Sequence, residues 1–163
     1  MIETVDVESR ASGDDHLSLR LWLRLLACTN LIEGCARSRL RADFDITLPR
    51  FDLMAQLQRN PAGLRMNEIS RRMMVTGGNV TRIVDQLDHE GLVTRRSSPG
   101  DRRSYTVRLT SAGRRAFAAM AQQHEAWVVE LFSVLSTKER LMLYGLLAKL
   151  KSHAAETVSG TDG

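Results

Sequence analysis

A pair of arginines follows a turn sequence within residues 91–113, and its chemistry suits contact with phosphate. Residues 99–101, Pro-Gly-Asp, are typical of a tight turn, and short β-rich runs flank them. The pattern predicts a β-hairpin that carries Arg102 and Arg103 at its tip. Exposed guanidinium groups add little to a hydrophobic core, but they bind DNA phosphates and narrow grooves. The hairpin is therefore a candidate basic finger for nucleic acid.

A second set of polar residues comes just before the hairpin. Thr76 is a suitable N-cap for a helix over residues 78–89, whose first two turns carry Asn79, Thr81 and Arg82. Arginine pairs well with guanine and asparagine with adenine, and a helix N-terminus favours phosphate. Asp101 is expected to orient Arg103 rather than to touch DNA. The candidate DNA-binding residues are Arg71, Arg72, Thr76, Gly78, Asn79, Thr81, Arg82, Arg96, Asp101, Arg102 and Arg103.

The positive charge of the chain is concentrated around these residues. The whole chain has a net charge of +4, yet residues 65–115 hold eleven arginines and five acidic residues, a local +6. The remainder is slightly acidic, at −2. This distribution is typical of an electrostatic footprint for nucleic acid.

Several other classes of protein are disfavoured. At 163 residues we expect a single domain, and no apolar run is long enough to cross a bilayer. With no signal-peptide pattern, the protein is expected in the cytoplasm, associated with the nucleoid through DNA. Cys28 and Cys35 do not have metal-ligand spacing, and on one straight helix they would be about 10 Å apart, too far for a disulfide. No catalytic constellation, cofactor site or metal site emerges, so an enzyme is not expected.

Hydrophobic periodicity predicts a mainly α fold with a small β-hairpin wing. Two short helices joined by a tight turn and followed by a hairpin make a winged helix-turn-helix, in which the second helix enters the major groove. Long apolar helices flank it on both sides in the sequence. The helices are expected over residues 17–42, from Pro49 to about residue 59, and over 66–74, 78–89, 110–135 and 138–153, the last opened by a Ser136–Glu139 capping box.

The chain resembles the MarR family of bacterial transcription regulators from about Leu17 to Lys151. The resemblance is carried by residues 66–70 (MNEIS), 78–87 (GNVTRIVDQL), 90–93 (EGLV), 101–104 (DRRS) and 110–113 (TSAG). It implies one MarR-type domain over residues 1–163, with dimerisation helices in 1–45 and 110–153, a DNA-binding module in 46–109 and a flexible tail in 154–163.

The resemblance also implies an obligate homodimer that binds a pseudo-palindromic operator, most often as a repressor. Wide apolar faces on the flanking helices agree with a shared core. A two-fold dimer should place its recognition helices roughly 34 Å apart. The candidate interface residues are Trp127, Leu131, Leu143, Leu146, Leu147 and Leu150.

Family members often release DNA when a small aromatic acid or phenolic compound binds. The segments 20–26 and 47–54 look like those of proteobacterial regulators of aromatic catabolism, which implies an aromatic acid or its coenzyme A thioester as effector. Candidate effector-binding residues are Arg20, Trp22, Leu23, Phe51, Asp52 and Met54.

An alternative is redox sensing, which some relatives perform with a cysteine near the start of the first helix and tyrosines nearby. Cys28 and Cys35 lie further along, and tyrosine occurs only at Tyr105 and Tyr144. A winged helix used only for protein contacts is disfavoured by the basic recognition surface.

Overall fold

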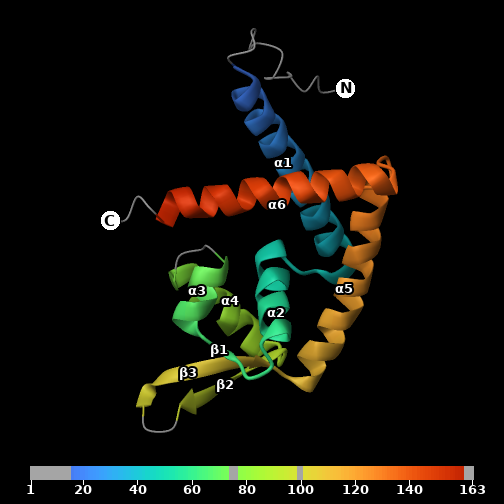
Figure 1. Cartoon of the computed structure of the whole chain (residues 1–163). Helices are drawn as coiled ribbons and strands as arrows, with labels where there is room; N and C mark the ends of the chain where they lie inside the picture. Colours follow the sequence, from blue (N-terminus) through green and yellow to red (C-terminus); the bar gives the residue numbers. More distant parts are fainter. Residues whose placement is uncertain (1–15, 74–76, 99–100, 160–163) are drawn as a thin grey trace. The chain divides into compact units, whose positions relative to one another are not determined.

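Six helices and a three-stranded sheet form the described part of the chain, which covers residues 16–73, 77–98 and 101–159 of a computed structural model (Figure 1). The contacts divide the chain into a unit that ends at His124 and a unit that begins at Glu125. In order, the elements are α1 (Leu17–Phe44), α2 (Leu48–Arg59), β1 (Leu64–Arg65), α3 (Met66–Met73), α4 (Gly77–His89), β2 (Val93–Ser98), β3 (Asp101–Leu109), α5 (Ser111–Leu131) and α6 (Thr137–Ser159). The mainly α fold with a small β wing is confirmed.

The core of the first unit lies between α2, α3, α4 and the sheet. Pro49 stands in the first turn of α2, where its missing N–H costs no hydrogen bond. The apolar sides of the three helices and of the sheet meet, and every one of these side chains is almost or completely excluded from water. They are Leu53, Met54, Leu57, Leu64, Ile69, Val80, Val84, Leu87, Val93 and Val107. This packing fixes the orientation of α4 against the sheet.

The sheet has the order β1–β3–β2, and both pairs of strands are antiparallel. The register pairs Val93 with Leu109 at the base and Ser98 with Asp101 near the tip, with an irregularity between Ser97 and Ser98. Strand β1 was absent from the sequence prediction. It is only two residues long, and alternation cannot be recognised over so short a run.

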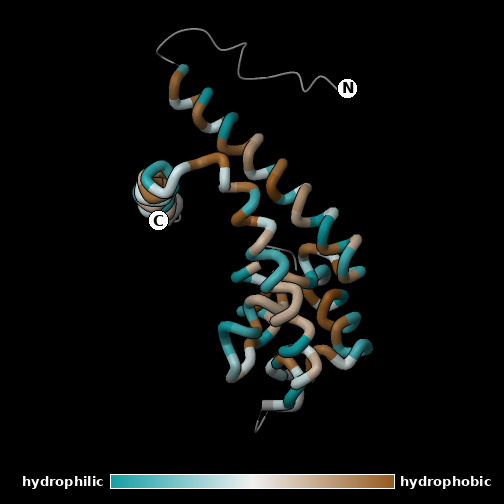
Figure 2. Tube along the Cα trace, turned by 90° about the vertical axis from the view of Figure 1, so that its right-hand side faces the viewer, coloured by the Kyte–Doolittle hydropathy of each residue, from teal (hydrophilic) through white to brown (hydrophobic). Residues whose placement is uncertain are grey.

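The first helix is longer than expected and mostly exposed. It ends at Phe44, and Asp45 after it takes a left-handed conformation (φ 49°). The Asp45 N–H donates to the Arg41 carbonyl oxygen, and the Ile46 N–H donates to the Leu40 carbonyl oxygen. Within α1, Ala36 and Leu40 are the buried residues. Figure 2 shows apolar residues recurring along the rest of α1, and the large exposed ones are Leu17, Leu19, Leu21, Trp22, Leu26 and Leu31.

A tight joint connects the base of the wing to α5. The Thr110 hydroxyl donates to the Gly91 carbonyl oxygen at 2.7 Å and accepts the Gly113 N–H at 2.9 Å. A Cβ atom added at Gly113 would lie 1.9 Å from the Leu92 carbonyl oxygen. Glycine is therefore required here, because the backbone of α5 touches the backbone of the strand base.

The second unit contains the end of α5 and the whole of α6. The predicted capping box is confirmed, since Ser136 N–H donates to Glu139 Oε2 at 2.8 Å and Glu139 N–H donates to Ser136 Oγ at 3.3 Å. The flexible tail expected from residue 154 is wrong over its first part, because α6 continues to Ser159. Ala154, Ala155 and Glu156 are good helix formers, which the small polar appearance of the segment concealed.

Candidate nucleic-acid interface

The recognition helix α4 separates a fully apolar side from a polar N-terminal end. Val80, Val84 and Leu87 are completely buried, whereas Thr81 and Arg82 are exposed. Asn79 is half-buried and accepts a hydrogen bond from Arg82 Nη2 at 3.4 Å. Two of the predicted base-contacting side chains therefore lie together on the surface of one helical turn. Thr76 lies outside the described residues, and the burial of Gly78 is not described either.

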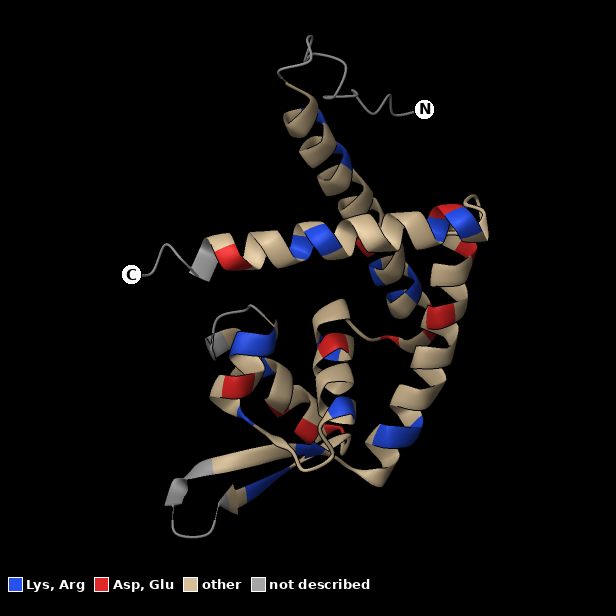
Figure 3. Ribbon diagram, viewed as in Figure 1, with Lys and Arg blue, Asp and Glu red and all other residues tan. Residues whose placement is uncertain are grey.

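The preceding helix α3 adds positive charge beside this end of α4. Arg71 and Arg72 occupy its last turn and are exposed. Glu68 holds the start of the same helix, because its carboxylate accepts the Arg65 backbone N–H at 2.8 Å. In the ribbon of Figure 3 the basic positions of α3 (blue) and its acidic position (red) lie at different heights of the helix. The predicted phosphate-binding pair is thus available to a ligand on the surface of the helix-turn-helix.

The wing follows α4 through β2 and β3. Arg96 is exposed on β2, as a DNA contact requires. The side chains of Asp101, Arg102 and Arg103 lie outside the described residues, so their predicted roles stay predictions. The pairing of Ser98 with Asp101 does confirm a tight hairpin at this position.

Arg95 joins the wing to α4, a contact that the sequence reasoning missed. Its Nη2 pairs with Asp85 Oδ1, and its Nε lies 3.4 Å from Asp88 Oδ2. The guanidinium group also stands 5.3 Å from the centre of the Tyr105 ring on β3. The hydrogen bond to Asp85 raises the pKa of Arg95, while desolvation opposes that shift. One side chain therefore connects the recognition helix to both long strands of the wing.

A second missed ion pair connects α2 to the segment between α4 and β2. Arg50 Nη2 pairs with Glu90 Oε2, and only 12% of the Arg50 side chain is exposed. The alternation of side chains along β2 could have indicated Arg95, because this residue lies two positions after the buried Val93 and therefore shares its face. No comparable local signal pointed to Arg50, whose partner lies 40 residues away.

The effector candidates fall into two groups within the first unit. Arg20 and Trp22 are exposed and Leu23 is half-buried near the start of α1, whereas Phe51 and Met54 lie in the core of α2. Phe51 contacts two rings of α5, with centroid distances of 5.4 Å to Phe117 and 4.9 Å to His124. Arg20 lines a shallow hollow with Leu17, Leu21 and Arg24, apart from Phe51 and Met54.

Asp52 is the candidate whose electrostatics are distinctive. It lies on the exposed side of α2, yet the atoms around its carboxyl group exclude enough water to raise its pKa. The neighbouring carboxylate of Glu33 raises the pKa further, and His124 and Arg59 act in the opposite direction. The carboxyl group therefore stands in a mixed polar setting between residues of α1, α2 and α5.

The dimer candidates of the second unit are mostly exposed. Trp127 is buried, with 9% of its surface exposed, whereas every residue of α6 from Thr137 to Thr157 is exposed. The exposed fractions are 37% for Leu131, 36% for Leu143, 61% for Leu146, 38% for Leu147 and 47% for Leu150. A helix so apolar and so open has a large surface available for a partner.

The remaining sequence candidates give no site of their own. Cys28 is exposed and Cys35 is half-buried, both on α1. Among the described residues, no group of three or more His, Cys, Asp or Glu side chains could hold a metal ion. Within the same residues, no helix is long and apolar enough to cross a membrane.

Comparison with known proteins identifies relatives of the whole arrangement. The model of the MarR family matches residues 44–104, which cover α2 to the start of β3. An HTH-type transcriptional regulator of Bacillus cereus is 30% identical over 142 residues, covering 86% of this chain and 93% of the relative. A protein of Thauera aromatica, named as a regulatory protein for the hcr operon, is 34% identical over 64% of this chain and 63% of its own length.

Solved structures agree with these sequence matches. A MarR family transcriptional regulator from Silicibacter pomeroyi is 29% identical, with a TM-score of 0.73 over 88% of this chain and 99% of that one. MarR from Escherichia coli in its apo form is 26% identical, with a TM-score of 0.69 over 78% and 94% of the two chains.

Proposed function

The chain belongs to the MarR family of DNA-binding HTH-type transcriptional regulators, and we propose that it is a homodimeric repressor. In this proposal each subunit places α4 in the major groove of a pseudo-palindromic operator and the wing in the adjacent minor groove. Family members are DNA-binding proteins without enzymatic activity.

One observation carries the mode of DNA binding. The first two turns of α4 present Thr81 and Arg82 to solvent while the opposite side of the helix is completely buried. The core does not need these polar side chains, and their types suit the edges of bases. Arg71, Arg72 and Arg96 are exposed on neighbouring elements and would hold phosphates on either side. Asp101 would orient Arg103 in the minor groove, with Arg102 beside it and Thr76 and Gly78 at the start of α4.

Dimerisation is supported by the exposed apolar side chains of the flanking helices. Those of α6 have no cover within their own unit, and an apolar surface of this extent is typical of an interface. We assign segments 1–45 and 110–153 to dimerisation and 46–109 to DNA binding. Two copies that shared Leu143, Leu146, Leu147 and Leu150 with Trp127 and Leu131 would remove this surface from water.

We infer an aromatic carboxylate, or its coenzyme A thioester, as the effector. The support is chemical. Arg20 offers a cation for a carboxylate, and Trp22 and Leu23 lie beside it on α1. Phe51, Asp52 and Met54 line the adjoining helix α2, where Phe51 already belongs to a ring cluster. Calorimetry with benzoates, hydroxycinnamates and their thioesters tests this, and no heat across the panel would exclude the class.

The redox alternative receives less support. Both cysteines belong to α1, whereas Tyr105 contacts Arg95 in the wing and Tyr144 belongs to α6. Helix α1 itself therefore carries no tyrosine beside its cysteines. Replacing Cys28 and Cys35 by serine should leave operator release by peroxide unchanged. Loss of a peroxide response in that variant would instead favour redox sensing.

The test of DNA binding is hydroxyl-radical footprinting on the DNA upstream of the chain's own gene. We expect two protected segments one helical turn apart. Arg82→Ala should weaken operator binding, and Arg103→Ala should lower the slope of log affinity against log salt by about one. Arg115→Ala, an exposed arginine on α5, is the matched control. Equal losses in all three variants would show a general charge effect and contradict the assignment.

A further inference from the structure

Three arginines lie on the outer face of the sheet, which is the side turned away from the helices. In the strand register Arg65 of β1 and Arg96 of β2 both stand opposite Thr106 of β3, and directly opposite residues share a face. Arg108 is two residues further along β3 and shares that face as well. Val107 lies between them in sequence and is completely buried on the helix side. We call Arg65, Arg96 and Arg108 the outer arginine face.

The three residues of the outer arginine face lie close together on neighbouring strands. Adjacent strands are about 4.8 Å apart, which puts the Cα atoms of Arg65 and Arg96 about 10 Å from each other. Both side chains are exposed, and Arg108 is half-buried. Among the described residues no carboxylate forms an ion pair with any of the three.

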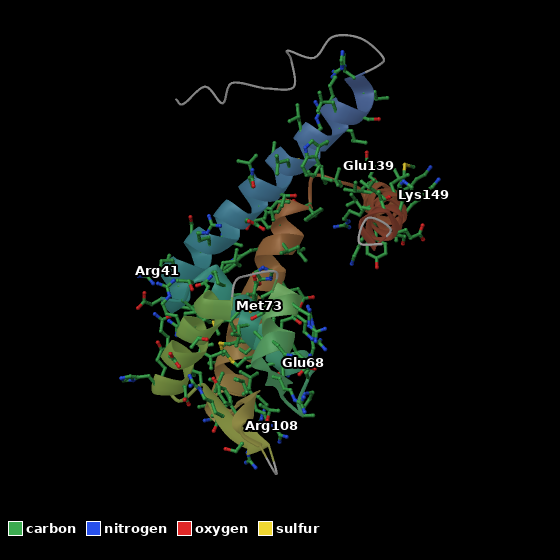
Figure 4. All side chains as sticks on the ribbon, turned by 90° about the vertical axis from the view of Figure 1, so that its left-hand side faces the viewer. Arg41, Glu68, Met73, Arg108, Glu139 and Lys149 are labelled. Carbon is green, nitrogen blue, oxygen red and sulfur yellow. The ribbon has the colours of Figure 1, made fainter. Side chains whose placement is uncertain are left out.

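The side chain of Arg108 is held in place on this face. Its chain crosses Gly63, where an added Cβ atom would lie 2.7 Å from Arg108 Cγ, so glycine makes room for the side chain. The Nε atom of Arg108 is buried without a hydrogen-bond partner among the described residues, as are those of Arg50 and Arg95. In Figure 4 Arg108 lies at the sheet, below the α3 residues Glu68 and Met73.

The neighbouring Arg95 forms ion pairs within the fold and provides a comparison for the outer arginine face. Arg95 and Arg96 are adjacent on β2 and therefore point to opposite faces. Arg95 is matched by two aspartates of α4, whereas the outer arginine face receives no such partner from the described residues. A binding role accounts for this difference, since unpaired arginines on one face repel each other.

We propose that the outer arginine face binds phosphates of the DNA that flanks the operator. The proposal rests on the proposed function, which puts both recognition helices near the centre of the operator. Because α4 packs on the helix side of the sheet, the outer face is turned away from α4. In this proposal it meets the DNA beyond the bases that α4 contacts. A duplex carries one negative charge per roughly 1.7 Å of its axis, which suits a surface where three arginines gather. The contact needs no particular base sequence.

The experiment compares two duplexes, and the first contains only the protected palindrome from the footprint. The second adds six base pairs of mixed sequence at each end. The proteins are the wild type, the double variant Arg65→Gln/Arg108→Gln and the control Arg115→Gln. Arg96 is left unchanged because it is already assigned to phosphates of the operator. Arg65→Gln alone, at an exposed position, serves if the double variant does not fold. Affinity is measured by fluorescence polarisation between 50 and 200 mM salt.

We expect the wild type and the control to bind the longer duplex more tightly and with a steeper salt dependence. Each phosphate contact should add about 0.9 to the slope, or about 3.5-fold in affinity across this salt range. The variants should lose the advantage of the longer duplex. Equal wild-type affinity for both duplexes, or an unchanged advantage in the variants, would overturn the proposal. If the wild type bound neither duplex, the proposed function itself would fail.

Discussion

Arg95 and Asp85 form an ion pair that ties the first long strand of the wing to the recognition helix. The same guanidinium group reaches Asp88 one turn further along α4 and the Tyr105 ring across the sheet. In the proposed function these two elements enter different grooves of DNA, and one side chain connects them. Arg95 is a positioning residue, since its guanidinium group contacts protein groups of α4 and β3.

Arg95→Gln should weaken operator binding about fivefold, which corresponds to ~1 kcal/mol for a partly exposed ion pair with a cation–π contact. The salt dependence should not change, because no phosphate contact is removed. Polarisation titrations at several salt concentrations measure both quantities. Arg96→Gln on the same strand is the control and should lower the slope. A lower slope for Arg95→Gln would mean that this residue contacts DNA directly.

Gly113→Ala should destabilise the fold by about 3 kcal/mol or more, because the new methyl group collides with the Leu92 backbone. Helix propensity alone predicts the opposite sign. The exposed neighbour provides the control, since Ala112→Gly should lower stability by about 1 kcal/mol through propensity. Urea unfolding of both variants gives the two free energies. A neutral Gly113→Ala would show that the strand base can move away from α5.

Asp52→Asn should raise the thermal stability at pH 7. The pKa of Asp52 is raised in the fold by partial burial and by Glu33, so the ionised form is the less stable one. The stabilisation from protonated Asp52 is complete below the pKa of the unfolded chain, about 3.9, and is lost as pH rises through the higher pKa of the folded chain.

The difference in melting temperature between Asp52→Asn and the wild type should therefore shrink as the pH is lowered from 7 towards 3.5. Thermal melts across that range measure it, with Asp43→Asn at an exposed position of α1 as the comparison. A difference that stayed constant with pH would show that the effect does not come from ionisation of Asp52.

Leu147→Glu should break the proposed dimer. A carboxylate in each copy would enter an apolar interface, and the dissociation constant should rise about 100-fold or more. Sedimentation equilibrium measures the change. Ser152→Glu adds the same charge at a polar position of α6 and should leave the association intact. Unchanged association of Leu147→Glu would place the interface elsewhere.

The sequence was a good guide wherever local chemistry decides the structure. The Ser136–Glu139 capping box, the helix start around Pro49 and the hairpin after α4 each depend on residues close together in the chain. The structure places them as predicted. Apolar periodicity also located α4 correctly, because its buried side follows one uninterrupted stripe.

Features that depend on distant residues could not be read in this way. Strand β1 exists because Leu64 and Arg65 pair with Val107 and Thr106, more than 40 positions away. The pairing of Arg50 with Glu90 has the same character. Helix α6 passes the expected end because alanine and glutamate sustain a helix that no local breaker stops before Ser159.

The acidic groups near the C-terminal end of α4 form ion pairs within the fold, which leaves the two ends of the helix with different charge. Asp85 and Asp88 are paired with Arg95, and Glu90 is paired with Arg50, so each potential source of repulsion is neutralised within the fold. The N-terminal end of the helix, with Arg82 and the nearby Arg71 and Arg72, keeps its charge. In the proposed function, this distribution of charge would orient the molecule by long-range attraction before any base is touched, and it would increase the fraction of productive encounters.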